Sequence, residues 1–194
     1  MARLNAQDWV EKGIKLLTQE GVQALKLERL CEALHKTKGS FYHHFRDMDS
    51  FVGVLLETWA ERQTTHPILY AETQDSPGQK LKRLGERVSQ LDHRLDQMIR
   101  VWSHSEPRAR AVLEQVDSRR LGYLSQCFQE LGCDQALADS LAEMQYIALL
   151  GAQQRYEKLD SPQALHTAQC FQNAIRLFLR SELKLSPDGP SSRK

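Results

Sequence analysis

The spacing of apolar residues in the middle of the chain constrains the fold more than any other feature. Between residues 81 and 102, apolar side chains recur in alternating steps of three and four, which is the period of one face of an α-helix. The residues of this stripe are Leu81, Leu84, Val88, Leu91, Leu95, Met98 and Trp102. No comparable alternation with the period of two that β-strands need occurs elsewhere. The sequence therefore predicts an all-α protein with one long helix over residues 81–102.

Cap residues and helix breakers set the ends of the other predicted helices. Gly21 suits the left-handed turn after a helix, and Thr37 and Asp47 are good N-caps. Pro67 is expected to stop the fourth helix, because proline cannot continue a helix interior. About nine helices are expected in all. Besides the stripe, they cover residues 8–20, 27–34, 38–44, 109–131, 135–159 and 162–185 and the segment from Asp47 to Pro67.

The helix lengths divide the chain into a small head of short helices at residues 1–47 and a bundle of longer helices at residues 48–185. Residues 186–194 hold two prolines, a glycine and three serines, so we expect a flexible tail there. The last two long helices are apolar on more than one side, and such helices need two partners. We therefore expect a homodimer in which these helices pack against their copies.

Composition narrows the classes of protein that the chain can represent. Hydrophobic residues make up 41% and charged residues 26%, which is ordinary for a folded soluble protein. No apolar run approaches the roughly 18 residues that a membrane-spanning helix needs, and charged residues interrupt residues 1–15 where a secretory signal would lie. We expect a cytoplasmic protein with no membrane role. The four cysteines form no Cys-x-x-Cys pair, so reduced thiols in the core are expected and no metal or cofactor.

A local concentration of positive charge points to nucleic acid, although the whole chain carries a net charge of only +1. From residue 35 to 46, the segment contains Lys36, Lys38 and Arg46 and no acidic residue, which gives a formal charge of +3. Two short helices joined by a tight turn, the second of them capped, form the arrangement that lays a helix in the DNA major groove. A basic surface at that helix favours phosphates.

The segment 37–45, Thr-Lys-Gly-Ser-Phe-Tyr-His-His-Phe, resembles the recognition helix of the TetR family of transcriptional regulators, and the resemblance extends over residues 9–56. It implies a repressor that binds double-stranded operator DNA as a homodimer, with an effector pocket and a dimer interface in residues 48–185. Lys26, His35 and Met48 depart from the pattern, since the family usually has a threonine, a turn glycine and a lysine there. Histidine adopts a left-handed turn less easily than glycine but more easily than a branched residue.

Chemistry and resemblance together assign roles on the predicted interface. Thr37 and the free amides at the helix start are expected to meet a phosphate, and Gly39 lets the backbone approach DNA. Tyr42 and His44 are expected to fix the register on the backbone. The DNA-binding set is Lys36, Thr37, Lys38, Gly39, Ser40, Tyr42, His43 and His44.

Alternative interpretations of the same residues stay open. Phe41 and Phe45, four residues apart, are expected to be core. Tyr42 is alternatively a packed surface aromatic, and the basic segment a solvated face without a partner. A metal pair at His43 and His44 is disfavoured, because adjacent helical residues point about 100° apart.

Residues with an apolar body and a polar tip are candidates for the effector pocket, which would suit a small, partly apolar organic molecule. Ordinary core positions are the alternative for each of them. Effector binding is hypothesised to move the fourth helix and change the separation of the two recognition helices. The candidates are Met98, Trp102, His104, Tyr123, Phe128, Met144 and Tyr146.

Two rival functions come from other classes. An all-helical enzyme would use His104 or Glu106 as acid or base, but no nucleophile, metal-ligand group or phosphate loop occurs at a recognisable spacing. A helical adaptor would keep the head without binding DNA. We therefore expect a regulator and not an enzyme.

Overall fold

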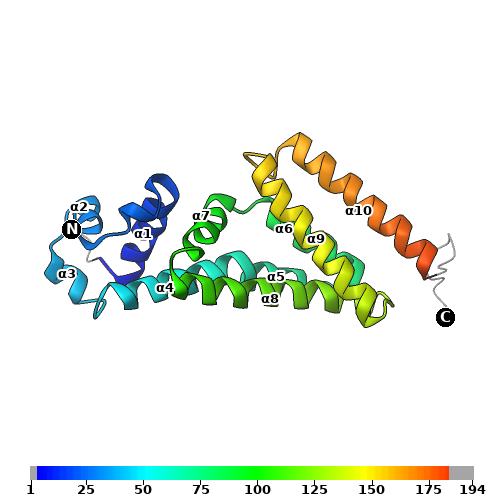
Figure 1. The fold of residues 1–194 in the computed structure, drawn as a ribbon, viewed down its shortest axis with the longest axis horizontal. Helices are drawn as coiled ribbons and strands as arrows, with labels where there is room; N and C mark the ends of the chain where they lie inside the picture. The colour runs from blue at the N-terminus through cyan, green and yellow to red at the C-terminus, as the bar shows by residue number, and fades with distance from the viewer. Residues whose placement is uncertain (1–3, 184–194) are drawn as a thin grey trace. The chain divides into compact units, whose positions relative to one another are not determined.

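The computed structural model describes residues 4–183, and within them the chain forms helices and connecting turns but no strand (Figure 1). The expected all-α fold of about nine helices is confirmed. The predicted tail at residues 186–194 lies outside the described residues. The helices are α1 (Ala6–Glu20), α2 (Leu27–Leu34), α3 (Lys38–Tyr42), α4 (Met48–Ala60), α5 (His66–Ala71), α6 (Pro77–Ser89), α7 (His93–Ser103), α8 (Pro107–Glu130), α9 (Gln135–Arg155) and α10 (Pro162–Glu182).

The predicted single helix over residues 81–102 is wrong. The structure divides this stretch into α6, which ends at Ser89, and α7, which begins at His93. Asp92 caps α7, because its side chain accepts a hydrogen bond from the Arg94 backbone N–H at 3.0 Å. The apolar spacing runs across the break without a change of step, so periodicity alone does not reveal the interruption.

The expected helix end at Pro67 is also wrong. After α4 the chain passes through a π-helical turn, Glu61–Thr65, and continues as α5 to Ala71. Pro67 lies in the first turn of α5. Thr65 and His66 keep helical φ and ψ, so the helical path runs on through Pro67 although the proline has no N–H to donate to it.

Contacts divide the chain into two compact units. The first comprises Met1–Glu72 and Leu91–Arg120, and the second comprises Thr73–Gln90 and Leu121–Lys194. The described parts of α1 to α5 and α7 therefore belong to unit 1, and α6, α9 and α10 to unit 2. Since α4 packs in the same core as α1, the functional boundary at residue 47 stays a prediction.

An aromatic cluster in the core of unit 1 holds α3 in place. The fully buried ring of Phe41 lies 5.4 Å from the Trp9 ring of α1, 5.2 Å from Phe45 and 5.7 Å from Phe51 of α4, measured between centroids. Such ring pairs contribute beyond their buried area. The expectation that Phe41 and Phe45 are core is confirmed, and the buried Phe41 fixes which face of α3 remains outside.

Unit 2 has a core of its own between α8, α9 and α10, which includes Phe128, Leu141 and Leu179. Cys31, Cys127 and Cys133 are buried, as expected, but Cys170 is exposed. The expectation that every cysteine fills a core is therefore wrong for Cys170. It precedes the buried Leu179 by nine residues, which places it on the opposite side of α10, about 180° away.

Among the described residues, no helix combines the length and apolar content that crossing a lipid bilayer requires.

Gly13 of α1 sits against α4 so closely that a larger residue is expected to disturb the head. A Cβ there would lie 2.6 Å from Cζ of the Phe51 ring, which is buried and held among other rings. Gly13→Ala is expected to lower the free energy of unfolding by about 1–3 kcal/mol, through overpacking. Urea unfolding measures the loss. Gly53→Ala on α4 is the control, since its Cβ would meet nothing within 4 Å; equal effects of the two changes would contradict the packing argument.

Candidate nucleic-acid interface

The turn between α2 and α3 has a defined left-handed geometry. His35 adopts φ 52° and ψ 47° directly after α2. The Lys36 N–H donates to the Cys31 carbonyl at 2.9 Å, and the His35 N–H donates to the Glu32 carbonyl at 3.1 Å. This pairing closes α2 in the manner of a Schellman motif, whose left-handed residue is usually glycine. The expected turn is therefore present, at a cost of about 1–2 kcal/mol for a side chain in this conformation.

The recognition segment begins with the predicted cap. The Thr37 side chain accepts a hydrogen bond from the Ser40 N–H at 3.3 Å, and α3 then runs only from Lys38 to Tyr42. The expected extension to residue 44 is wrong. The chain turns after Tyr42 because Phe45 enters the core and Asp47 starts α4 with a capping box to Ser50. The Ser50 N–H and the Arg46 guanidinium lower the pKa of Asp47 to about 2.

The eight residues predicted to bind DNA lie in the turn before α3, in α3 and directly after it, and none of them is fully buried. Tyr42 has 54% of its area exposed although its ring meets the buried Phe41 ring edge-on, with centroids 5.6 Å apart. Lys38 and His43 are also exposed. Lys36, Ser40 and His44 are half-buried, and Thr37 and Gly39 are exposed. The structure thus leaves all eight residues at least partly accessible within one short segment, and their contact with DNA stays a prediction.

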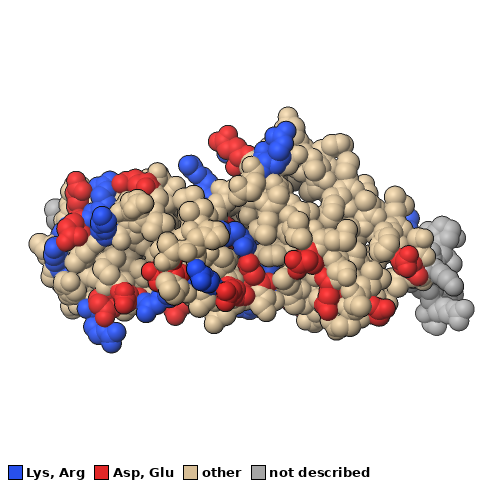
Figure 2. All heavy atoms as spheres, in the orientation of Figure 1, with Lys and Arg blue, Asp and Glu red and all other residues tan. Residues whose placement is uncertain are grey.

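The charge of the segment is lower than the sequence suggests. Lys38 Nζ lies 2.6 Å from Glu28 Oε1 of α2, and this contact raises the pKa of Lys38 and lowers that of Glu28. Arg46 Nε lies 2.8 Å from Asp47 Oδ2. Figure 2 shows blue and red side chains intermixed over this end of unit 1. Glu28 lies ten residues before Lys38, so a count over residues 35–46 misses it.

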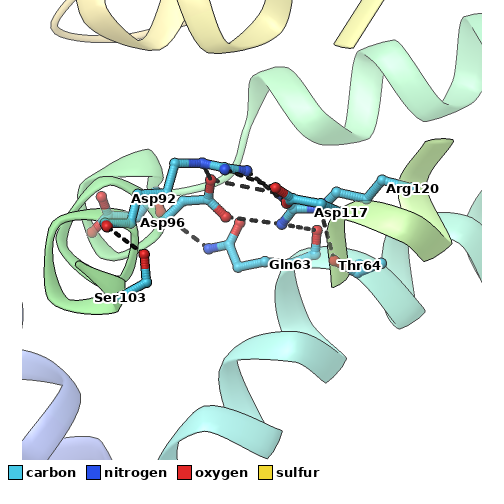
Figure 3. Close-up of polar contacts among 8 residues, drawn as sticks. Gln63, Thr64, Asp92, Asp96, Ser103, Asp117 and Arg120 are labelled. Carbon is cyan, nitrogen blue, oxygen red and sulfur yellow. Dashed lines mark hydrogen bonds and ion pairs between the residues drawn. The ribbon is translucent and has the colours of Figure 1, made fainter. Parts of the chain in front are cut away.

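A buried ion network in unit 1 joins α7 and α8 to the π turn that follows α4 (Figure 3). Asp96 of α7 is only 1% exposed, and its Oδ1 accepts a hydrogen bond from Arg120 Nη2 of α8 at 2.8 Å. Arg120 Nε donates to Thr64 Oγ1 at 2.9 Å, and Nη2 contacts the Gln63 carbonyl at 3.3 Å. One guanidinium therefore bonds to a buried carboxylate and to the turn at once.

Charge stabilises the ionised form of Asp96 despite its burial. Burial alone would raise the pKa of the carboxyl, but the charge and hydrogen bond of Arg120, with the charge of Arg100, outweigh it and lower the pKa. Arg100 also binds Asp117 of α8 through two N–H groups, at 2.9 and 2.8 Å. The sequence analysis did not predict this network. The only local indication of it is the spacing of four residues between Asp96 and Arg100, which allows an ion pair along one helix.

Residues 10–54, which contain most of α1, all of α2 and α3 and the start of α4, match the sequence model of a family described as bacterial regulatory proteins, tetR family. Residues 10–54 are therefore similar to the DNA-binding domain of TetR-family regulators. The match confirms the resemblance drawn from residues 9–56, and it favours a regulator over an enzyme. No curated protein matches the chain by sequence.

Solved structures of TetR-type regulators share the fold along most of the chain. A TetR/AcrR family transcriptional regulator has a TM-score of 0.74 at 19% identity, covering 90% of this chain and 97% of its own. E. coli NemR in its reduced form also has a TM-score of 0.74, at 17% identity, with coverages of 88% and 96%. A TetR regulator from Legionella pneumophila has a TM-score of 0.66 at 14% identity, with coverages of 94% and 99%. At these identities the likeness concerns the fold.

The predicted effector-binding residues fall in both units of the chain. Met98 and Trp102 pack in the core of unit 1, and His104 is exposed after α7. In unit 2, Tyr123, Phe128 and Tyr146 are buried and Met144 is 53% exposed. Their role in binding an effector stays a prediction.

Proposed function

We propose that the chain is a cytoplasmic repressor that binds a palindromic operator as a homodimer and leaves it when a small, partly apolar effector binds. The observation that carries this proposal is the outward surface of α3, which the buried Phe41 ring orients and which presents Lys38 and Tyr42 to solvent. A rigid short helix with a polar outer face fits the major groove.

Exposed apolar side chains on α9 and α10 support the homodimer. Ile147 of α9 is 57% exposed, and Leu177 and Phe178 of α10 are 65% and 43% exposed. Large apolar side chains gathered on two helices of one unit favour burial in an interface. A second copy of the same helices would cover them in a two-fold arrangement, and it would present two recognition helices to one duplex.

The route from effector to DNA is proposed to run through α4. Its N-terminal half packs with the head, and the π turn at its end is bound by Arg120. An effector that shifts α7 or α8 would move Arg120 and thereby α4, which changes the spacing of the recognition helices. Such coupling requires that effector and operator favour different dimer conformations.

The proposal is tested by selecting bound sequences from random duplexes with the purified protein and measuring the mass of the protein and of the complex. We expect a dimer and enriched inverted repeats whose half-sites lie about 34–36 Å apart, or a multiple of that spacing. The affinity should fall steeply with salt. A monomer that selects no sequence, or no bound duplex even at low salt, would overturn the proposal.

A further inference from the structure

The π turn Glu61–Thr65 is bound to α7 and α8 through polar groups of its middle residues. Gln63 Nε2 donates to the backbone carbonyl of Asp92, the N-cap of α7, at 3.0 Å. Arg120 of α8 donates to Thr64 Oγ1 at 2.9 Å and to the Gln63 carbonyl at 3.3 Å (Figure 3). Thr64 is only 2% exposed, so its hydroxyl is a buried acceptor for the guanidinium. A shift of the turn relative to α8 therefore breaks bonds of Arg120.

The residue before these two, Arg62, binds the same turn to the head. Its guanidinium donates through two N–H groups to both carboxylate oxygens of Glu11 of α1, which raises the pKa of Arg62 and lowers that of Glu11. Two residues from Glu11 along α1, the Trp9 ring lies 5.4 Å from the Phe41 ring of α3. Three consecutive residues of the turn thus connect α7 and α8 on one side to α1 and the recognition segment on the other.

Two physical arguments favour a functional role for this turn over a role in stability alone. A π turn interrupts the regular helical hydrogen bonds, and such turns occur frequently at functional sites. Buried charges also cost free energy that apolar residues would not cost, so the network around Arg120 fixes one geometry of the turn at the expense of stability. A fixed geometry at this place sets the position of α1 relative to α8.

We propose that Thr64 is a positioning residue for operator binding. Its hydroxyl fixes the π turn on Arg120, and the turn holds α1, and through it α3, by the ion pair of Arg62 with Glu11. This is a second link between α8 and the recognition segment, beside the path along α4. The inference rests on the proposed operator binding and assigns Thr64 no contact with DNA.

Thr64→Val tests this role, because it keeps the shape of the side chain and removes the oxygen that Arg120 binds. We expect the variant to bind the selected duplex about fivefold more weakly than the parent. Thr64→Ser keeps the hydroxyl and should bind as the parent does. Fluorescence anisotropy with a labelled duplex measures the affinity, and thermal melting measures the stability of each variant.

Ser125→Ala is the matched control for lost stability. Ser125 in unit 2 is 5% exposed, and its hydroxyl donates to Asp139 Oδ1 at 2.6 Å, so this change also removes a buried hydroxyl that bonds to a charged group. Ser125→Ala should melt at a lower temperature than the parent, as Thr64→Val should, and yet bind the duplex as tightly as the parent.

A double-mutant cycle with Glu11→Gln tests whether the effect travels through α1. Glu11→Gln breaks the ion pair with Arg62, so Thr64→Val should weaken operator binding less in that background than in the parent. The comparison within one background cancels any direct effect of the lost charge on DNA. Equal effects of Thr64→Val in the two backgrounds would contradict the link through α1 and overturn the inference.

The remaining outcomes separate the inference from the proposed function. If Thr64→Val binds the duplex as tightly as the parent, or if Ser125→Ala weakens binding to the same extent, Thr64 serves stability only and the inference is overturned while operator binding stands. If the parent itself binds no duplex at low salt, the proposed operator binding fails and the inference fails with it.

Discussion

Asp96→Ala is expected to lower the free energy of unfolding by about 3–5 kcal/mol, a large part of the 5–15 kcal/mol that typically stabilises a domain. The change would leave the guanidinium of Arg120 in a buried site without its carboxylate, since Asp96 is 1% exposed and bonds to Arg120 at 2.8 Å. Its hydrogen bonds to Thr64 and to the Gln63 carbonyl in the π turn carry no compensating charge. Urea unfolding followed by circular dichroism measures the loss.

Two controls separate the buried pair from ordinary surface charge. Glu11→Ala removes an exposed partner of Arg62 and is expected to cost about 1 kcal/mol or less. The double change Asp96→Leu with Arg120→Met removes both charges and should recover much of the loss, because apolar residues replace buried pairs well. A loss for Asp96→Ala no larger than that for Glu11→Ala would show that the network does not support unit 1.

The lowered pKa of Asp96 also fixes the sign of its pH dependence. A carboxyl whose pKa is lower in the folded state adds stability above its unfolded pKa of about 3.9, and this stability is lost as the pH falls through the folded value. The parent protein should therefore lose more stability between neutral and acidic pH than Asp96→Ala does. Parallel unfolding curves at pH 7 and below pH 4 compare the two; an equal loss in both would contradict an ionised Asp96.

Lys38→Ala together with Tyr42→Ala is expected to weaken operator binding by about 2–5 kcal/mol, because each side chain is expected to contact the duplex. Folding should change by about 1 kcal/mol or less, since Tyr42 is 54% exposed and the ion pair of Lys38 with Glu28 lies at the surface. Fluorescence anisotropy with a labelled duplex and thermal melting measure the two quantities.

Lys82→Ala is the charge-matched control for that prediction. Lys82 is a well-exposed cation on α6 in unit 2, paired at 3.8 Å with Glu86. Its loss should leave operator affinity almost unchanged at a given salt concentration. If the variant with both Lys38→Ala and Tyr42→Ala binds the duplex as tightly as the parent, α3 does not belong to the DNA interface. That result would favour an adaptor.

Local chemistry predicts the head well and the long-range contacts poorly. Thr37 caps α3 and Phe41 enters the core as the sequence indicates, because a cap acts within three residues and an aromatic spacing of four defines one helix face. The same local rules do not predict the break before α7. Leu91 continues the apolar spacing of three and four residues, although the next residue, Asp92, is the N-cap of a new helix.

The network around Asp96 lies beyond any local pattern. Arg120 is 24 residues from Asp96 and 56 from Thr64, so nothing in the sequence around one of them indicates the others. The ion pair of Lys38 with Glu28 was missed for a related reason, because charge was counted along a segment while the partner lies on the neighbouring helix. Tertiary pairing, rather than composition, sets the charge that α3 presents.

The π turn at Glu61–Thr65 changes the phase of a long helical path. Among the buried residues of α4, Phe51, Leu55 and Trp59 follow one another at intervals of four, whereas the first buried residue after α4, Thr64, follows Trp59 after five. A π turn takes up the additional residue, so the inward side of the path stays inward on both sides of it. Deleting one residue from the turn would rotate α5 by about 100° about the helix axis relative to α4. Both helices would stay intact, but the inward faces of α4 and α5 would no longer line up.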